Sequence, residues 1–360
     1  MPNATGGRPQ LLSGLRPLWR GQSSIQLGRD PDRSVVVEGV DEASARLLVG
    51  LDGRRSEAQV LADAATDGLD TAVVTRLLTG LRRCGLVVDA ESALLSELGG
   101  PDIAERLEPD HASLTLASPQ RGAAGTLRQR QRRTVAVHGA GRIGAPTAAL
   151  LAASGVGRLA ILDQHRSRPC DAAPGGIMPQ DAYQPRAEAA TAAVRRAAPE
   201  AEVGPLHPGQ LPDVAVLTDP EPVEPELRRV LHRMRVPHLR VHIRETAAVV
   251  GPLVLPGISS CLTCADLHRR DRDPAWPVLA TQLTVPRRRQ REPADVVLAS
   301  QAAAITALQV LALLDGDDPA TLDGTLEVRL PDWRVRRRTW PPHPSCPCGA
   351  SQPSARRLAG

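Results

Sequence analysis

The sequence contains no lysine and no phenylalanine, and it has one tyrosine. All 44 basic residues are therefore arginines. A P-loop needs a lysine on the phosphates and imine chemistry needs a lysine amine, so Walker-type ATPases and Schiff-base enzymes are excluded. Hydrophobic residues make up 42% of the chain, so a core built from Leu, Val, Ala and Ile is expected.

Signals of nucleic-acid binding, secretion and membrane insertion are weak. The net charge of +4 is small for 360 residues, and few aromatic side chains could stack on bases. The arginine-rich runs 128–133 and 287–291 are expected to be solvated. No basic stretch followed by an apolar run opens the sequence, so no secretory signal is expected. The uncharged run 296–314 could span a membrane, but its glutamines and alanines favour a buried helix against a sheet. We expect a cytoplasmic protein that binds neither nucleic acid nor membrane.

Residues 24–89 have the pattern of a small domain. Two strand-like runs, SIQLG and RSVVVEGV, are separated by the turn-like segment RDPD. Asp41, Ser56 and Asp70 are each placed to cap the start of a helix, and Gly85 ends the third helix before the strand-like LVV. Two strands, three helices and a closing strand are typical of a winged-helix unit. The third helix carries only three arginines, which favours a solvated face over a DNA-reading one.

The same region resembles the PqqD-like leader-recognition domain of enzymes that mature ribosomal peptides. The similarity lies in the strand pair, in LLVGLDGRRSEAQVLADAA and in the closing LRRCGLVVDA. The resemblance implies that residues 1–90 bind the leader of a precursor peptide as an added strand beside the hairpin. Residues 91–133 are rich in Gly, Pro, Ser and Arg, so we expect a linker there with a short helix near 92–98.

A glycine-rich turn follows the apolar run TVAVH. In the sequence GAGRIG, Gly139 permits a tight turn, Gly141 lets the backbone approach a phosphate, and Gly144 allows the next helix to pack closely. The second strand, RLAILD, ends in Asp163, where a carboxylate commonly accepts ribose hydroxyls. The pattern predicts an α/β, Rossmann-like domain over residues 134–360, and it leaves open whether a dinucleotide, ATP or nothing binds.

From Thr134 to about Gly349, the order of motifs resembles the ThiF/MoeB family, the bacterial relatives of ubiquitin-activating enzymes. That family holds ATP phosphates on the glycine turn and with a basic residue of a QPK-like motif, and it holds Mg²⁺ with a TDN-like aspartate. The resemblance implies that Arg186 of Gln-Pro-Arg contacts phosphate, that Asp219 of Thr-Asp-Pro binds Mg²⁺, and that Asp163 holds the ribose. Because the family makes acyl-adenylates on C-terminal carboxylates, Arg186 and Asp219 are the candidate catalytic residues. A homodimer through the nucleotide domain is also implied.

The chain departs from the family pattern in three places. Arg142-Ile143 stands where the turn usually has a glycine pair. The loop after Asp163 lacks the expected Asn and Arg, and Arg186 replaces a lysine, which keeps the charge but changes the shape. An arginine supplied by a partner subunit cannot be assigned, although 128–133 precede the first strand of this domain. Both ATP binding and adenylation therefore remain open.

Four of the six cysteines form two close pairs. Cys261 and Cys264, followed more than 80 residues later by Cys346 and Cys348, predict a structural zinc site rather than free thiols or a disulfide. The ThiF/MoeB family often carries two such pairs, but its second pair is usually C-x-x-C. The C-x-C spacing here strains ligation by both of its thiolates.

Two histidines could replace a cysteine as metal ligands, and two further cysteines lie outside the pairs. His343 is a substitute ligand for the strained pair, and His268 is a weaker one. Cys170 lies in the loop after the ribose aspartate, and no activating group is placed beside it, so we expect an inert thiol. Cys84 is expected to be packed in the core behind the third helix.

Three functions are consistent with these motifs. The first is a scaffold that binds a precursor leader and presents the peptide to a YcaO-type cyclodehydratase in azole or azoline biosynthesis, with an eroded ATP site. The second is an active MgATP-dependent adenylyltransferase acting on a C-terminal carboxylate. The third, an NAD-dependent oxidoreductase, needs a hydride-handling site that the sequence does not reveal.

Overall fold

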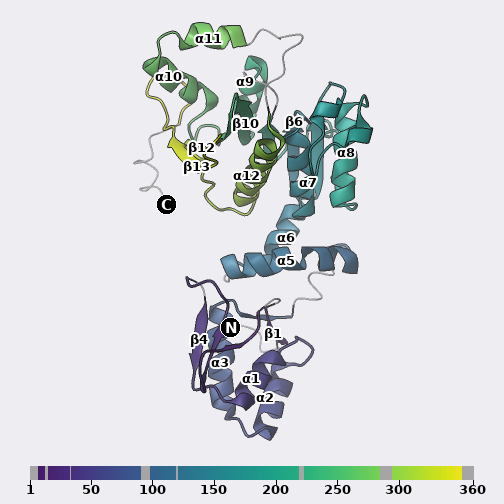
Figure 1. The fold of residues 1–360 in the computed structure, drawn as a ribbon, viewed down its shortest axis with the longest axis vertical. Coiled ribbons are helices and arrows are strands. Elements are labelled where there is room, and N and C mark those ends of the chain that lie inside the picture. The colour runs from purple at the N-terminus through teal and green to yellow at the C-terminus, as the bar shows by residue number, and fades with distance from the viewer. Residues whose placement is uncertain are drawn as a thin grey trace. The chain divides into compact units, whose positions relative to one another are not determined.

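The computed structural model describes residues 7–12, 15–32, 34–90, 98–118, 121–218, 223–283 and 294–350. The chain divides into two compact units, Met1–Arg128 and Gln129–Gly360, which we describe separately (Figure 1). The first unit ends inside the segment predicted as a linker. The predicted domain boundaries at residues 90 and 133 stay a prediction.

The first unit contains the predicted strand pair, three helices and closing strand, together with two further short strands. β2, β3 and β4 form an antiparallel sheet in that order, and β1 pairs with β5. The elements in chain order are β1 (Pro9–Leu11), β2 (Leu18–Trp19), β3 (Ser24–Leu27), β4 (Val35–Glu38), α1 (Glu42–Val49), α2 (Glu57–Thr66), α3 (Thr71–Arg83) and β5 (Val87–Asp89). The name winged helix for this unit stays a prediction.

The three predicted helix starts are confirmed. The side chains of Asp41 and Asp70 each accept a backbone N–H at 2.8 Å. Ser56 forms a capping box with Gln59, in which each side chain bonds the other residue's backbone. These local bonds satisfy N–H groups that the first helical turn leaves without a partner, so the sequence signal was sufficient.

Cys84 is exposed, so the expectation that it is packed in the core is wrong. The helix ends at Arg83, and the chain turns at Gly85, which has a φ of 68°. Because of this turn, Leu86 rather than Cys84 continues the buried side of α3.

The segment predicted as a linker is helical over much of its length. It contains α5 (Pro101–Ala117) and α6 (Ala123–Gln131). Leu98, Leu107 and Leu127 form a small apolar cluster there. The helix predicted near 92–98 lies outside the described residues, except for Leu98.

One arginine of the run 128–133 is buried, which corrects the expectation that this run is solvated. Only 5% of the Arg130 side chain is exposed, and its guanidinium is bonded to the equally buried Asp315. Arg133 pairs with Asp213 at 2.8 Å. The other arginine-rich run, 287–291, lies outside the described residues.

The second unit is built on an eight-stranded mixed sheet, which confirms the predicted α/β class. The strand order is β13-β12-β11-β10-β9-β6-β7-β8. The strands from β8 to β10 are parallel, and those from β10 to β13 are antiparallel. Its strands are β6 (Thr134–His138), β7 (Arg158–Leu162), β8 (Glu202–Val203), β9 (Val214–Leu217), β10 (His238–Arg244), β11 (Ala247–Val254), β12 (Gly324–Arg329) and β13 (Val335–Thr339).

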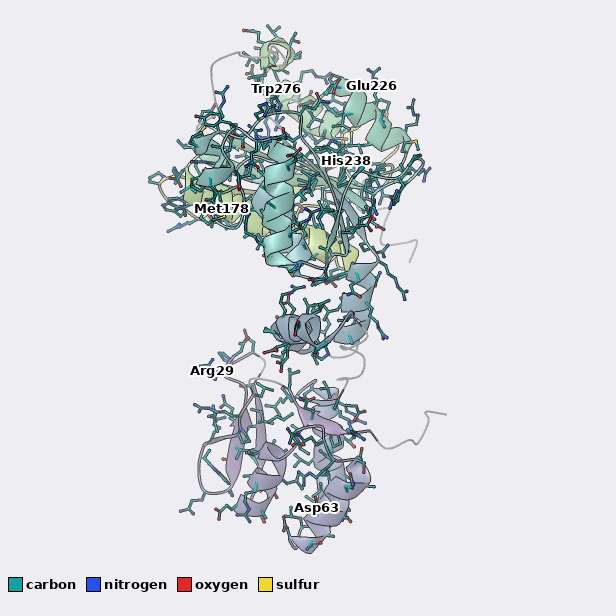
Figure 2. The ribbon with its side chains drawn as sticks, turned by 90° about the vertical axis from the view of Figure 1, so that its right-hand side faces the viewer. Arg29, Asp63, Met178, Glu226, His238 and Trp276 are labelled. Atoms are coloured by element: carbon teal, nitrogen blue, oxygen red, sulfur yellow. The ribbon has the colours of Figure 1, made fainter. Side chains whose placement is uncertain are left out.

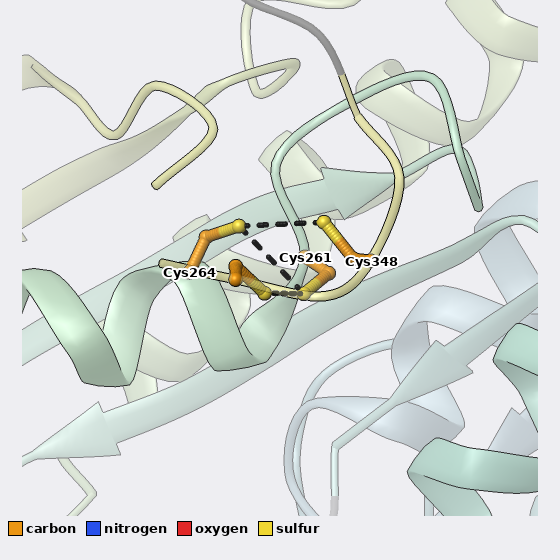
Figure 3. A group of neighbouring side chains, drawn as sticks. Cys261, Cys264 and Cys348 are labelled. Atoms are coloured by element: carbon orange, nitrogen blue, oxygen red, sulfur yellow. Dashed lines mark hydrogen bonds between the residues drawn. The ribbon is translucent and has the colours of Figure 1, made fainter. Parts of the chain in front are cut away.

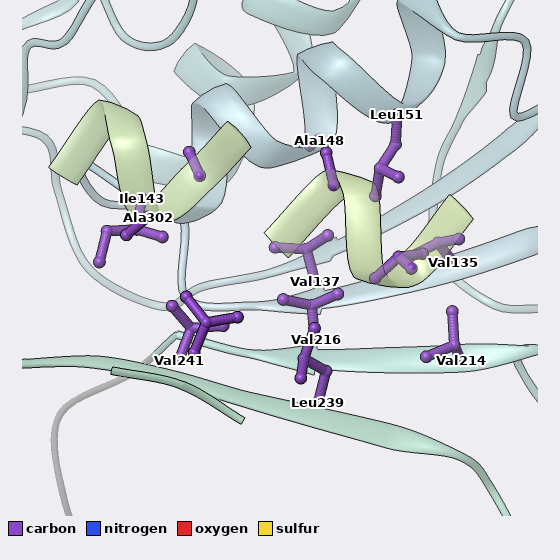
Figure 4. Packing of buried hydrophobic residues seen from close by; sticks show 14 of the residues in the cluster. Val135, Val137, Ile143, Ala148, Leu151, Val214, Val216, Leu239, Val241 and Ala302 are labelled. Atoms are coloured by element: carbon purple, nitrogen blue, oxygen red, sulfur yellow. The ribbon is translucent and has the colours of Figure 1, made fainter. Parts of the chain in front are cut away.

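Helices cover both faces of this sheet. They are α7 (Gly144–Ala153), α8 (Arg186–Ala197), α9 (Pro225–Arg233), α10 (Leu262–Arg272), α11 (Trp276–Leu283) and α12 (Val296–Leu314). Figure 4 shows the main core, in which aliphatic side chains of β6, β9 and β10 meet α7 and α12. Two helical turns of the 3₁₀ type, Pro169–Asp171 and Pro179–Asp181, lie in the loop between β7 and α8.

The uncharged run 296–314 forms α12, as a helix packed against the sheet. Within the described residues it is the one helix long and apolar enough to cross a membrane by length and composition. Its buried positions, from Leu298 to Leu314, belong to the core that β10, β11 and α7 also build. The packing matches the predicted buried helix.

Candidate nucleotide and metal sites

The glycine turn lies where the strand order reverses. It follows β6, which has β7 on one side and β9 on the other. In open α/β sheets, ligands bind in the crevice beyond the carboxyl ends of the strands at such a point. The fold therefore places this turn at the usual ligand position.

Sterics explain two of the three turn glycines. Gly139 has a φ of 87°, a conformation that costs glycine little and other residues more. A Cβ on Gly144 would lie 1.8 Å from the Gly139 carbonyl oxygen, so no side chain fits there. A Cβ on Gly141 would meet no atom of the described residues within 4 Å, so among these residues the backbone at Gly141 faces open space.

A threonine holds this turn to the neighbouring strand. The Thr218 hydroxyl lies 2.7 Å from the Gly139 carbonyl oxygen and 3.1 Å from that of His138, so its proton can serve either acceptor. Burial lowers the pKa of His138, which keeps this imidazole neutral beside the turn. The contact between the glycine turn and the residue that follows β9 therefore involves no charged group.

Asp163 is fully enclosed at the end of β7. Its carboxylate accepts the Ala140 N–H at 2.8 Å and the His165 N–H at 2.7 Å, and none of its side chain is exposed. Burial raises the pKa of Asp163, but the two backbone bonds and the Arg186 guanidinium outweigh it and leave the pKa below its ordinary value. The group is an ionised carboxylate that fastens the glycine turn.

Arg186 binds two carboxylates at once. Its guanidinium donates to Asp163 at 3.2 Å and to Asp171 at 3.1 Å. Asp171 comes from the loop that replaces the Asn and Arg of the family pattern. The structure therefore brings the predicted ribose and phosphate residues together, bonded to each other. The predicted magnesium ligand, Asp219, lies outside the described residues.

The four predicted thiols form one cluster (Figure 3). Cys261 lies 3.8 Å from Cys264 and 3.6 Å from Cys346, and Cys264 lies 3.6 Å from Cys348, measured between sulfur atoms. All four sulfurs lie within 4.8 Å of one another. Tetrahedral zinc with Zn–S bonds of about 2.3 Å separates its sulfurs by about 3.8 Å. The donor set and its spacing fit a metal ion, and zinc is our proposal for it.

Neither predicted substitute ligand joins the cluster. His343 bonds Asp271 through Nε2 at 2.7 Å and accepts the Ser345 N–H on Nδ1. His268 contacts the Pro341 carbonyl oxygen at 2.8 Å. The C-x-C pair reaches the site without them, because each of its thiols contacts a different cysteine of the first pair.

A cavity of about 190 Å³ lies on the face of the sheet opposite α12. Its walls come from β10, β11, α9, α10 and α11. Figure 2 shows Glu226 on α9 and Trp276 at the start of α11. The pKa of His242 lies well below its ordinary value, mainly because the side chain is buried. The cavity wall therefore carries a neutral imidazole there. Burial also lowers the pKa of His238 on the same strand to about 4.

Comparison with known protein families assigns this chain to a family. Residues 114–348 match the profile of the ThiF family. The chain belongs to the ThiF family. A search of curated protein sequences finds no match.

Solved structures similar to this ThiF-family chain share its fold. Escherichia coli MccB with selenomethionine MccA has a TM-score of 0.67 and 14% identity, over 95% of this chain and 99% of that one. The same enzyme with ATP has a TM-score of 0.67 and 15% identity, over 94% and 99%. PaaA has a TM-score of 0.67 and 17% identity, over 91% and 98%. At these identities the likeness establishes the fold alone.

Two of the residues that the ThiF-family pattern assigns to ATP are bonded to each other in this structure. Asp163 is enclosed and fully bonded, and Arg186 is committed to two carboxylates. Arg142, which stands in place of a turn glycine, donates to the Ala294 carbonyl oxygen at 2.7 Å, just before α12. Among the described residues, the backbone at Gly141 is the part of the turn that still faces open space.

Three residues of this site were not assigned a role from the sequence. They are Thr218, which bonds the turn, Asp171, which binds Arg186, and Ala140, whose N–H binds Asp163. The first could have been found from its place directly after a buried strand. The others depend on loop geometry, for which the sequence holds no periodic signal.

Proposed function

We propose that this ThiF-family protein binds the leader of a precursor peptide and presents the peptide to a YcaO-type cyclodehydratase, in the cytoplasm, with an eroded ATP site of its own. The mutual bonding of Asp163 and Arg186, reinforced by Asp171, carries the proposal. To bind MgATP, both groups would have to leave partly buried ion pairs, which costs free energy that nucleotide binding must offset.

Peptide capture is proposed for the first unit. In the part of this unit that the structure describes, β4 ends the sheet β2-β3-β4, so its outer edge is open to an added strand. Half of its side chains are exposed, including Val36. The MccB structures support a peptide ligand by analogy, since they hold MccA or N-formylated MccA.

Pyrophosphate exchange tests the eroded site. With candidate precursor peptides from neighbouring short genes and labelled pyrophosphate, we expect no exchange into ATP above the background of a no-enzyme control. We also expect ATP binding to stay weak in Arg186→Met, because Asp163 remains bonded to the Ala140 and His165 N–H groups and its carboxylate loses its counter-charge. Arg195→Met, an exposed change on the same helix, is the matched control and should leave ATP binding unchanged.

Exchange that requires both Asp163 and Arg186 would overturn this proposal and support the active adenylyltransferase.

Leader binding is measured separately by calorimetry with the same peptides. We expect Val36→Glu on β4 to weaken it, and Val73→Glu on α3, also exposed, to leave it unchanged.

A homodimer through α12 and α7 is proposed for the second unit. On the described surface, Val297 and Leu308 of α12 are 60% and 63% exposed, and Leu150 of the adjoining α7 is 40% exposed. No charged residue interrupts α12. Such an apolar helix face on a soluble unit favours association with a second copy.

Leu308→Arg should convert the dimer to a monomer, because a guanidinium would be buried without a partner at the proposed interface. Light scattering after gel filtration should show half the mass of the unmodified protein. Leu211→Arg, at an exposed loop position, is the control and should leave the mass unchanged. A monomeric unmodified protein would contradict the proposal.

A further inference from the structure

A cluster of arginines lies on the antiparallel end of the large sheet, on the face that carries Glu327. Three guanidinium groups surround that carboxylate, from Arg244 at 3.5 Å, Arg329 at 3.7 Å and Arg338 at 3.3 Å. Only 9% of the Glu327 side chain is exposed, whereas 35–48% of each arginine side chain is. One shielded carboxylate therefore holds three guanidinium groups that face solvent.

A fourth arginine extends this cluster to the edge of the sheet. Arg336 lies opposite Glu327 in the antiparallel register, so its side chain is on the same face. It pairs with Asp332. We call the four residues Arg244, Arg329, Arg336 and Arg338 the arginine strip. Within the described residues, two carboxylates pair with its four positive charges, which leaves a net positive charge of two.

The strip adjoins an open strand edge. Within the described residues, β13 is the last strand of its sheet and pairs with β12 alone. All five of its residues are exposed. An edge strand presents a row of backbone N–H and C=O groups on which an extended peptide can add. Successive side chains of such a peptide alternate between the faces, so every second one would face the strip.

We propose that β13 and the arginine strip bind an extended, acidic segment of the peptide substrate as an added β-strand. The inference rests on the proposed function, because it names the class of peptide that the protein holds. Charge complementarity requires acidic side chains at alternate positions, where they meet guanidinium groups already oriented by Glu327. The backbone edge selects a peptide over a nucleic acid, which cannot continue the hydrogen-bond ladder.

Edge protection is the competing explanation, since charged side chains commonly prevent edge strands from aggregating. Protection requires charge on the strand itself. It does not require Arg244 of β10 and Arg329 of β12, which lie away from the edge and share the carboxylate with Arg338. The convergence of three strands on one buried acid favours a binding surface.

Fluorescence anisotropy with the full chain tests the inference. The probe is a fluorescein-labelled octapeptide of alternating Glu and Thr. We expect it to bind at least about tenfold more tightly than the Gln-Thr octapeptide, the typical effect of losing a few charge-assisted bonds. We also expect it to bind more tightly than the Glu-Pro octapeptide, which keeps the charge but loses every second backbone N–H and has its φ angles fixed away from regular strand geometry.

Variants locate the binding site of this probe. The double variant Arg329→Ser/Arg338→Ser should weaken binding by about tenfold or more. Arg329→Ser alone should weaken probe binding by less than the double variant does. Because this side chain is about half exposed, the single variant should fold even if the double variant unfolds. Arg195→Ser, on the exposed face of α8, is the control and should have no effect.

Three results would overturn the inference: equal binding of the Gln-Thr or Glu-Pro octapeptide, unchanged binding in both arginine variants, or stronger binding of oligothymidylate than of the Glu-Thr probe. Failure here is separable from failure of the proposed function. Leader binding that depends on Val36, with no binding of the acidic probe, would refute the strip alone. Probe binding without leader binding would refute leader capture alone.

Discussion

Replacing Cys264 with serine should abolish binding of the proposed zinc ion and strongly destabilise the second unit. Cys264 is fully buried, and its sulfur contacts two of the other three thiols. Structural zinc sites in zinc-finger peptides contribute about 10–16 kcal/mol of apparent binding free energy, so losing even part of this exceeds most single substitutions. The zinc content, measured by mass spectrometry of the metal, should fall from one ion per chain to none, and the melting temperature should fall with it.

The cluster connects two distant parts of the chain. Cys261 and Cys264 lie at the beginning of α10, whereas Cys346 and Cys348 follow β13. Without the metal, the chain after β13 loses this attachment. Treatment with a chelator should therefore reproduce the effect of the substitution and expose four thiols to a thiol-reactive dye.

The pH dependence of zinc binding follows from the thiol pKa values. The side-chain hydrogen bond to Cys264, followed by burial, raises the pKa of Cys261 well above its ordinary value. Burial raises the pKa of Cys346 to about 12. Both thiols are thus protonated at neutral pH in the metal-free protein, and zinc must displace their protons. Zinc affinity should therefore rise with pH and fall as the solution is acidified.

Cys170→Ser is the matched control. Cys170 is exposed in the loop between β7 and α8 and lies outside the cluster, so zinc content and melting temperature should not change. If Cys264→Ser keeps its zinc, the metal is not held by these thiols. Peptide mapping that finds disulfides between the pairs in the purified protein would contradict the site equally.

The sequence predicted those features that depend on local chemistry. Asp41, Ser56 and Asp70 cap helices through bonds to backbone two or three residues away, so their roles are readable from spacing. The α/β class followed from the glycine turn between an apolar strand and an apolar helix. The thiol cluster was predicted from the spacing of the two cysteine pairs. The spacing did not reveal that each thiol of the C-x-C pair contacts a different cysteine of the first pair.

Features that depend on distant partners could not be predicted. Arg186 has the charge of a phosphate ligand, and its pairing with Asp171 depends on the path of the intervening loop. Helix α5 was missed because the Gly, Pro, Ser and Arg content of residues 91–133 indicated a linker, whereas the helix packs Leu107 against Leu98 and Leu127. In each case the deciding interaction or packing lies beyond the range of a local pattern.

Arg130 is the clearest such case, and its substitution is the second large effect that we expect. Its guanidinium donates to both carboxylate oxygens of Asp315, at 2.8 and 2.6 Å, and to the Ser154 carbonyl oxygen at 3.0 Å. The exposed fractions of the two paired side chains are 5% and 7%. Removing one partner of a buried pair leaves an uncompensated charge, so Arg130→Leu should lower the free energy of unfolding by about 3–5 kcal/mol.

Urea denaturation measures this change, and a double variant separates its cause. Arg130→Leu/Asp315→Leu removes both charges, so it should be less destabilised than the sum of the two single variants. Arg132→Leu, two residues away and exposed, should change the free energy by no more than about 0.5 kcal/mol. If Arg130→Leu proved as mild as Arg132→Leu, the run 128–133 would behave as solvated charge, and the ion pair between Arg130 and Asp315 would not stabilise the second unit.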